Sequence, residues 1–179
     1  MTRTAGIVIR PATPQDAEAV EGLRVAAWKA AYRGIVPGAF LDGMTVDGGR
    51  RRRMITERAC GCVENVAVQD GTIAGWIVAG PCRDDDRAEP WHGEVYACYV
   101  LPGSWRGGIG RRLMAHATRA LEEAGRGDVT LWVLERNERA RRFYEACGFS
   151  PDGTRQFLGL LGEQVPEVRY RRPALTPGR

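Results

Sequence analysis

The sequence predicts a mixed α/β fold in which several helices pack against one sheet. Along the chain, segments with apolar residues at helical spacing alternate with segments in which apolar and polar residues alternate. The 179 residues are enough for one domain with its own core. An apolar content of 44% and a charged content of 27% are ordinary for a globular protein, and no apolar run is long enough for a membrane span.

We expect a single domain over residues 1–172 and a disordered tail over residues 173–179. Residues 1–6 lack the apolar stretch of a secretory signal, and five irregularly spaced cysteines argue against a disulfide framework. Both features favour a cytoplasmic protein. Cys60 and Cys62 have no second ligand pair, and the chain has only two histidines, so we expect no metal site.

The first part of the chain predicts a strand at residues 7–10 and two helices. Residues 13–16 read Thr-Pro-Gln-Asp, a combination typical of a helix start. The apolar stripe of the first helix is formed by Ala17, Val20, Leu23, Ala27 and Ala31. Gly34 and the Pro-Gly pair at 37–38 end it, and an arginine-rich second helix is expected at 49–59.

Three strands follow. The first starts at Val63 and ends at Asp70-Gly71, a dipeptide of tight hairpin turns, and the second covers 73–79. Residues 81–91 contain prolines and three consecutive aspartates, which indicates an exposed loop. Residues 94–100 form the fourth strand of the chain.

The last part of the chain predicts two helices, one strand and a closing hairpin. After the glycines at 107–110, one helical face carries Ile109, Leu113, Ala117 and Leu121. Residues 129–134 are a buried strand, and a short helix at 137–147 stops at Gly148. Strands at 149–161 and 164–171 complete the sheet.

A glycine-rich turn stands between the fourth strand and the following helix. Gly107, Gly108 and Gly110 allow close approach of the backbone to an anion, and the helix N-terminus offers N–H groups and a positive dipole end. Arg106 and Arg111 add charge-assisted contacts. The alternative is a tightly packed helix entry with solvated arginines.

Residues 105–110, Trp-Arg-Gly-Gly-Ile-Gly, resemble the pyrophosphate-binding motif [QR]-x-x-G-x-[GA] of the GNAT superfamily, with Trp105 in place of Gln or Arg. Residues 137–149 resemble its second motif, N-x-x-A-x-x-F-Y-x-x-x-G-F, at every fixed position. The order of expected elements is similar to that of the family from residue 7 to about residue 171. The chain is therefore identified as resembling this superfamily over nearly its whole length.

The resemblance implies a GNAT-like acyl-CoA N-acyltransferase fold with splayed fourth and fifth strands. It also implies acetyl-CoA as cosubstrate, without a metal. The residues implied to bind it are Cys98, Val100, Trp105, Arg106, Gly107, Gly108, Gly110, Arg111 and Asn137. Cys98 and Val100 would act through their backbone groups, and Asn137 is equally a plain helix N-cap.

For catalysis, the resemblance places the hydroxyl of Tyr144 near the thioester sulfur, although a tyrosine on such a helix is often core. Glu94 is a candidate general base and Glu135 its rival, with solvated carboxylates as the alternative for both. A set of aromatic residues would shape an amine pocket or pack as core: Trp28, Tyr32 and Phe40.

We therefore expect an N-acetyltransferase that moves the acetyl group of acetyl-CoA directly to a primary amine of a small molecule or peptide. One alternative is a non-catalytic acyl-CoA-binding protein, since a fold does not fix its chemistry. Another is a basic nucleic-acid-binding module, suggested by the arginines at 50–53 and a net charge of +4, which is too small to imply nucleic acid by itself. We expect no nucleic-acid or membrane partner, and members of the family often form homodimers.

Overall fold

The computed structural model describes residues 6–174, which form one seven-stranded sheet in the order β1-β2-β3-β4-β5-β7-β6. The strands are β1 (Val8–Pro11), β2 (Val63–Gln69), β3 (Thr72–Pro81), β4 (His92–Val100), β5 (Asp128–Leu134), β6 (Ser150–Leu160) and β7 (Glu163–Arg172). All neighbours are antiparallel except β4 and β5, which are parallel. The predicted mixed α/β sheet is thus confirmed. Residues 175–179 of the expected tail lie outside the described residues.

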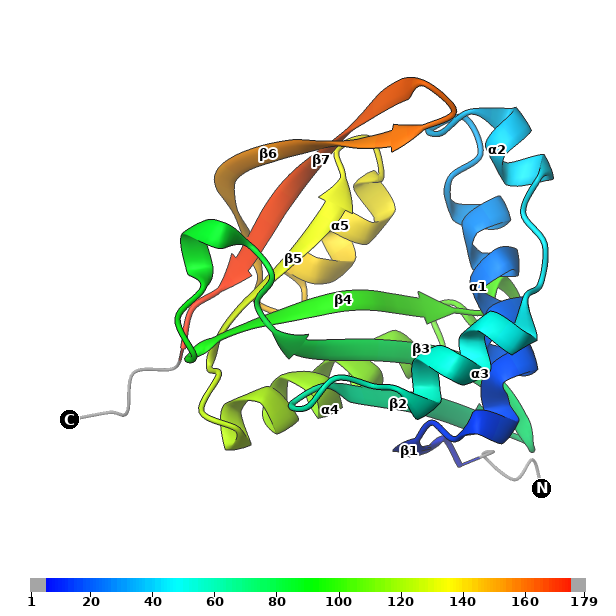
Figure 1. Ribbon diagram of the computed structural model, residues 1–179, viewed down its shortest axis with the longest axis horizontal. Helices are drawn as coiled ribbons and strands as arrows, with labels where there is room; N and C mark the ends of the chain where they lie inside the picture. The colour runs from blue at the N-terminus through cyan, green and yellow to red at the C-terminus, as the bar shows by residue number, and fades with distance from the viewer. Residues whose placement is uncertain (1–5, 175–179) are drawn as a thin grey trace.

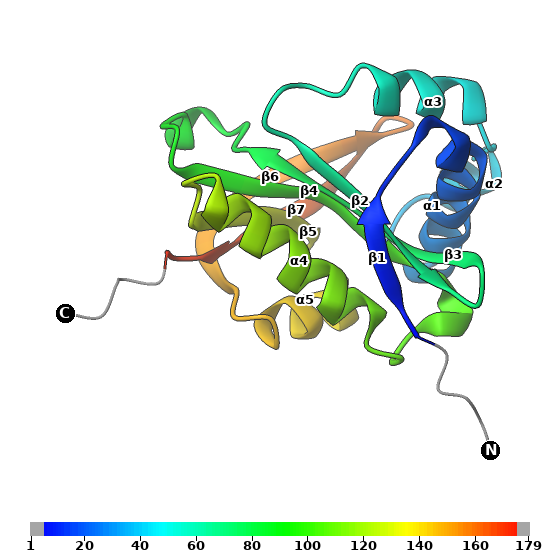
Figure 2. The ribbon, with the colours of Figure 1, turned by 90° about the horizontal axis from the view of Figure 1, so that it is seen from below.

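Helices cover both faces of the sheet (Figures 1 and 2). On one side lie α1 (Ala17–Ala31), α2 (Gly38–Asp42) and α3 (Gly48–Thr56), and on the other lie α4 (Ile109–Glu123) and α5 (Glu138–Glu145). We call these sides the α1 face and the α4 face. Each has its own apolar core, because the apolar residues of each strand alternate between the two faces.

Helix α4 packs unusually close to the sheet. A Cβ atom added to Gly75 of β3 would lie 2.7 Å from both Ile109 and Leu113 of α4. Only glycine permits this approach. The close packing fixes the first turn of α4, and hence the glycine-rich turn that precedes it.

Strands β4 and β5 are paired over only part of their length. Their register joins residues 92–95 of β4 to residues 128–131 of β5, while β5 continues to Leu134 alongside β7. Figure 1 shows β5 rising away from β4 beyond this point. The expected splay of the fourth and fifth strands is confirmed, and it leaves residues 96–100 of β4 without a neighbour on that side.

Some boundaries differ from the sequence-based expectation. The segment after Pro37 forms the short helix α2, which the Pro-Gly pair concealed, since proline and glycine are also tolerated at a helix start. Strand β4 begins at His92, earlier than expected. The 81–91 loop contains a single 3₁₀ turn at Asp85–Arg87. None of these differences changes the order of the elements around the splay.

Candidate active site

A cavity of about 830 Å³ opens where β4 and β5 separate. It is bounded by the unpaired end of β4, the glycine-rich turn, the start of α4 and one side of α5. Its lining comprises Cys98, Val100, Ser104, Trp105, Arg106, Gly108, Ile109, Gly110, Arg111, Arg139, Ala140, Phe143 and Tyr144. Most residues that the sequence predicted to bind a coenzyme are therefore brought together around one cavity.

The glycine-rich turn presents the N-terminus of α4 to this cavity. Gly108 occupies the N-cap position with φ of +80°, a left-handed conformation that favours glycine, and a Cβ there would meet no atom within 4 Å. Gly110 has a different role, which is to let α4 and α5 pack closely. A Cβ atom added at Gly110 would lie 3.2 Å from the ring of Phe143 in α5. Arg106 and Arg111 also line the cavity. Free helix N–H groups and two guanidinium groups make this end suited to an anion.

Trp105, which replaces the Gln or Arg of the family motif, contacts a third arginine of the cavity lining, Arg139. Its indole Nε1 donates a hydrogen bond of 2.8 Å to the carbonyl of Val100, which fixes the ring. The guanidinium carbon of Arg139 lies 3.5 Å from the ring centroid, a cation–π contact. The carbonyl of Val100 thereby already accepts one hydrogen bond, so its N–H is the freer of the two backbone groups.

The backbone of β4 faces the cavity through alternate residues. The N–H of Leu101 donates to Ala74 of β3, so the polar groups of Val100 and Cys98 point away from β3. The bond from Trp105 to the Val100 carbonyl agrees with this direction. Cys98 thus offers both backbone groups at the splay, where an extended ligand can pair with them.

Tyr144 and Cys98 both line the cavity, and burial is the main influence on the pKa of each. Burial raises the pKa of the Tyr144 phenol well above its usual value, and the nearby Cys98, Tyr99 and Cys147 raise it further. Burial likewise raises the pKa of the Cys98 thiol to about 12. Both groups are protonated at neutral pH, so the Tyr144 hydroxyl carries a proton and Cys98 is a poor nucleophile.

Glu94, Gly107 and Asn137 do not line the cavity. Glu94 is 2% exposed, stands in the paired part of β4, and accepts hydrogen bonds from the backbone and guanidinium of Arg83. The side chain of Asn137 accepts a hydrogen bond of 3.2 Å from Ala140 N, so its N-cap role is the one observed. Glu135, the rival base, forms an ion pair of 2.8 Å with Arg155.

The aromatic residues expected near an acceptor lie together on the α1 face. The ring centroids of Trp28 and Tyr32 are 4.7 Å apart, and those of Trp28 and Phe40 are 5.7 Å apart. All three are partly buried against the core formed with Leu134 and Val165. Sequence analysis missed a carboxylate beside them, Glu167 of β7, because a lone glutamate in a strand belongs to no motif.

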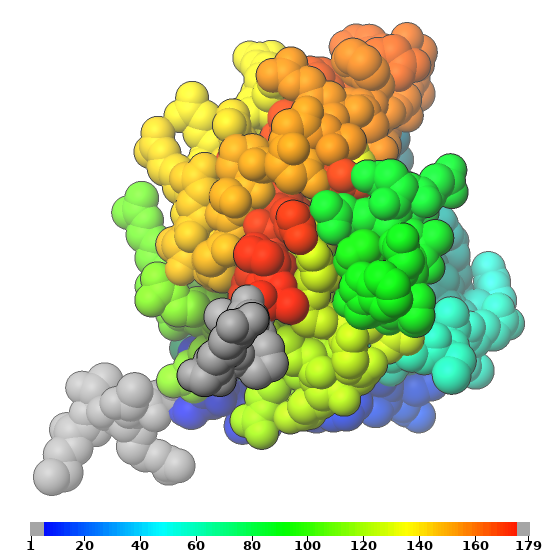
Figure 3. All heavy atoms as spheres, turned by 90° about the vertical axis from the view of Figure 1, so that its left-hand side faces the viewer, coloured from blue at the N-terminus to red at the C-terminus, as the bar shows by residue number. Residues whose placement is uncertain are grey.

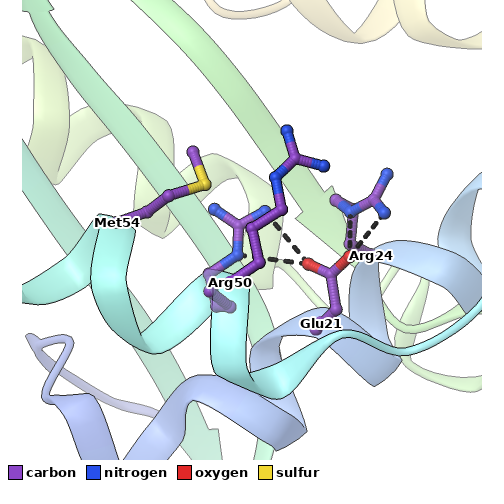
Figure 4. A pocket seen from close by; sticks show the side chains of 5 residues that line it. Glu21, Arg24, Arg50 and Met54 are labelled. Carbon is purple, nitrogen blue, oxygen red and sulfur yellow. Dashed lines mark hydrogen bonds and ion pairs between the residues drawn. The ribbon is translucent and has the colours of Figure 1, made fainter.

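A second, small pocket of about 110 Å³ lies between α1 and α3 (Figure 4). There Glu21 is buried and binds Arg24 and Arg51, and Arg51 also lies 4.5 Å from the ring centroid of Trp76. One of the four consecutive arginines is therefore used to join two helices and the sheet. This reduces the basic surface on which the nucleic-acid alternative depended.

Two further features of the described residues bear on the class of protein. Within residues 6–174, no helix is both long and apolar enough to cross a membrane. In the same part of the chain, no three or more His, Cys, Asp or Glu side chains are grouped so as to hold a metal ion.

Comparisons with known proteins agree with this geometry. The Acetyltransferase (GNAT) family model matches residues 26–149. A Mycobacterium tuberculosis protein named "Probable N-acetyltransferase Rv2775" is 32% identical over 176 residues, with 94% of this chain and 95% of the relative covered.

Two solved structures share the fold. The PaiA N-acetyltransferase of Thermoplasma acidophilum, solved with coenzyme A, has a TM-score of 0.75 at 19% identity, over 94% of this chain and 99% of its own. YncA of Salmonella typhimurium, solved with acetyl-CoA, also has a TM-score of 0.75, at 18% identity over 98% of both chains. These two structures show the fold alone. The family match and the near full-length relative show that the chain belongs to the GNAT family of acetyltransferases.

Proposed function

We propose that this enzyme binds acetyl-CoA in the cavity at the splay and transfers the acetyl group directly to a primary amine. The observation that carries the proposal is that one cavity joins a helix N-terminus, three arginines and Tyr144. Anion-binding groups and a phenolic hydroxyl therefore belong to the same cavity. The domain expected over residues 1–172 is the unit we propose to act.

The residues present fit the coenzyme in chemistry and size. Gly108 and the first N–H groups of α4 would bind the pyrophosphate, with Arg106, Arg111 and Arg139 adding positive charge. The backbone groups of Cys98 and the N–H of Val100 would pair with the extended pantetheine arm. The proposal therefore includes Arg139, which sequence analysis had not selected.

The chemistry needs a neutral amine and a proton for the departing sulfur. The amine nitrogen attacks the thioester carbonyl carbon, and the carbon–sulfur bond breaks. Tyr144 then donates its phenolic proton to the thiolate and recovers one from the nitrogen of the newly formed amide. The raised pKa of Tyr144 keeps this proton in place until the sulfur leaves. The cysteines take no covalent part.

The test of coenzyme binding is Gly108→Asp, which puts a negative side chain where the pyrophosphate would lie. The matched control is Gly125→Asp at the other end of α4, because Gly125 also has a positive φ (+78°) and no atom within 4 Å of an added Cβ. We expect calorimetric titration to show acetyl-CoA affinity at least about tenfold weaker for Gly108→Asp only. Equal affinity in both variants would contradict the proposed phosphate site.

A non-catalytic acyl-CoA-binding protein is the competing function. It would bind acetyl-CoA in the same titration but release no CoA thiol with any amine. Thiol release measured with pooled primary amines and peptides therefore separates the two functions.

A further inference from the structure

Glu167 lies on the α1 face, where the splay opens toward α1 and α2. In β7 the side chains alternate, and Val165 belongs to the core beneath α1 and α2 whereas Val168 belongs to the core beneath α4. Glu167 therefore shares the face of Val165. Its strand neighbours are Leu134 of β5 and Gln156 of β6. Figure 1 shows the β6–β7 hairpin extending to α2.

The carboxylate of Glu167 is half-buried and sparingly bonded. Gln156 donates one hydrogen bond of 2.8 Å to it, and no arginine or lysine forms an ion pair with it among the described residues. Burial raises the pKa of Glu167. In this it differs from Glu94 and Glu135, each of which is paired with an arginine. Glu167 is thus a carboxylate that can still accept a proton or bind a cation.

Tyr32 belongs to the aromatic cluster on the same face as Glu167. Burial raises the pKa of Tyr32 well above its usual value, and Tyr99, Tyr144 and Glu167 raise it further. Glu167 pairs with Leu134 at the splayed end of β5, and Tyr144 lines the cavity at the same splay. An acceptor amine that enters the splay from the α1 face would therefore meet Glu167 on its way to the thioester.

The side chains around Glu167 also indicate which class of acceptor molecule bears the amine. Trp28, Tyr32 and Phe40 are only partly buried, and Leu158 of β6 packs against the same cluster. Aromatic faces beside a carboxylate favour an ammonium group on an aromatic or apolar body.

We propose that Glu167 binds the ammonium group of the acceptor and takes its proton, and that the acceptor is a primary amine borne on an aromatic or apolar group. This inference rests on the proposed acetyl transfer at the splay. One proton passes from the ammonium to the Glu167 carboxylate, which leaves the nitrogen lone pair free to attack the thioester. Glu167 afterwards releases that proton to solvent, so the reaction yields amide, CoA thiol and one proton.

The test compares Glu167→Gln with Glu163→Gln, an exposed glutamate at the start of the same strand. In Glu167→Gln the new side-chain amide keeps an oxygen for the bond from Gln156 but accepts no proton. The probes are 2-phenylethylamine, a strong base, and 2-phenylethylhydrazine, which has the same body and a more weakly basic nitrogen. For Glu167→Gln we expect kcat/KM with the amine to fall by roughly 10²-fold or more, with a clearly smaller fall for the hydrazine. Glu163→Gln should match the parent with both.

Two results for Glu167→Gln would overturn its role as a base. One is an unchanged kcat/KM with the amine, and the other is an equal loss with both probes, which would indicate a structural role. A parent that binds acetyl-CoA and acetylates spermidine but not 2-phenylethylamine would refute the aromatic or apolar acceptor class. Failure of the proposed function is distinguishable, because acetyl-CoA would then not bind in calorimetry, or no amine would release thiol.

Discussion

At the scale of single residues, Tyr144 is the side chain on which the proposed chemistry depends most. Tyr144→Phe removes one oxygen and keeps the ring that packs near Phe143 and Phe149. Because a thiolate leaving into a buried site needs a proton donor, we expect kcat to fall by roughly 10²- to 10⁴-fold. Acetyl-CoA affinity and thermal stability should stay close to those of the parent.

Steady-state kinetics with an amine that the parent acetylates, together with calorimetry, check this expectation. An unchanged kcat with chemistry rate-limiting would remove Tyr144 from the mechanism. A parallel loss of coenzyme affinity would make it a binding residue. The two parameters therefore have to be measured on the same preparation.

The residues that sequence could identify are those with a motif around them. Gly108, Gly110 and Tyr144 were located because fixed spacings mark them, and the structure brings all three to one cavity. Glu167 carried no such mark, since its significance comes from three elements distant in sequence. Glu94 was selected from its position near the start of β4, but that position did not reveal that Arg83 already binds its carboxylate.

At the scale of elements, the 81–91 loop is attached to β7 by a buried arginine. Arg169, with a side chain 4% exposed, bonds Asp84, Asp86 and Asp152. Figure 3 shows this loop, in green, against the orange and red of β6 and β7. The loop was expected to be simply exposed, but its aspartates are partners of a cation more than 80 residues away, which no local pattern reveals.

Arg169→Met should therefore destabilise the protein by about 3 kcal/mol, because it leaves partly buried carboxylates without a counter-charge. The control is Arg155→Met in the same hairpin, whose ion pair with Glu135 is largely exposed and should matter by less than about 1 kcal/mol. Urea unfolding followed by circular dichroism measures both. Equal effects would show that the buried cluster does not stabilise the fold.

The elements themselves were predictable where periodicity was strong. The stripe of α4 follows from burying one side of a helix, and the apolar runs of β2 and β3 follow from burying strands on both faces of the sheet. The short α2 was missed because five residues are too few to show a period. The splay of β4 and β5 came only from the family resemblance, since each strand alone is an ordinary apolar segment.

At the scale of the whole molecule, stability should decrease in acid. Hydrogen bonds from Arg10 lower the pKa of Asp16 to about 2. Because this pKa lies below the usual value near 4, the ionised carboxylate stabilises the fold above about pH 4, and the contribution is lost as the pH falls toward about 2. Its size is about 2 kcal/mol at most, since Arg10 is 40% exposed.

Asp16→Asn should accordingly be less stable than the parent at pH 7, and the difference should shrink at pH 3. Asp42→Asn, at an exposed position, is the control and should follow the parent at both pH values. Denaturant unfolding at the two pH values checks this. A difference that is as large at pH 3 as at pH 7 would assign the effect to packing rather than to charge.

The short parallel contact between β4 and β5 also divides the chain into two continuous pieces. The piece from β1 through α4 supplies four antiparallel strands of the sheet and the helices α1 to α4, and the piece from β5 through β7 supplies the other three strands and α5. The backbone passes from one piece to the other once, through the turn at 124–127. The cavity therefore lies between two pieces of one polypeptide, and within the sheet these are joined by the pairing of residues 92–95 with residues 128–131. We expect a substitution that weakens this pairing to alter the width of the cavity without touching any ligand.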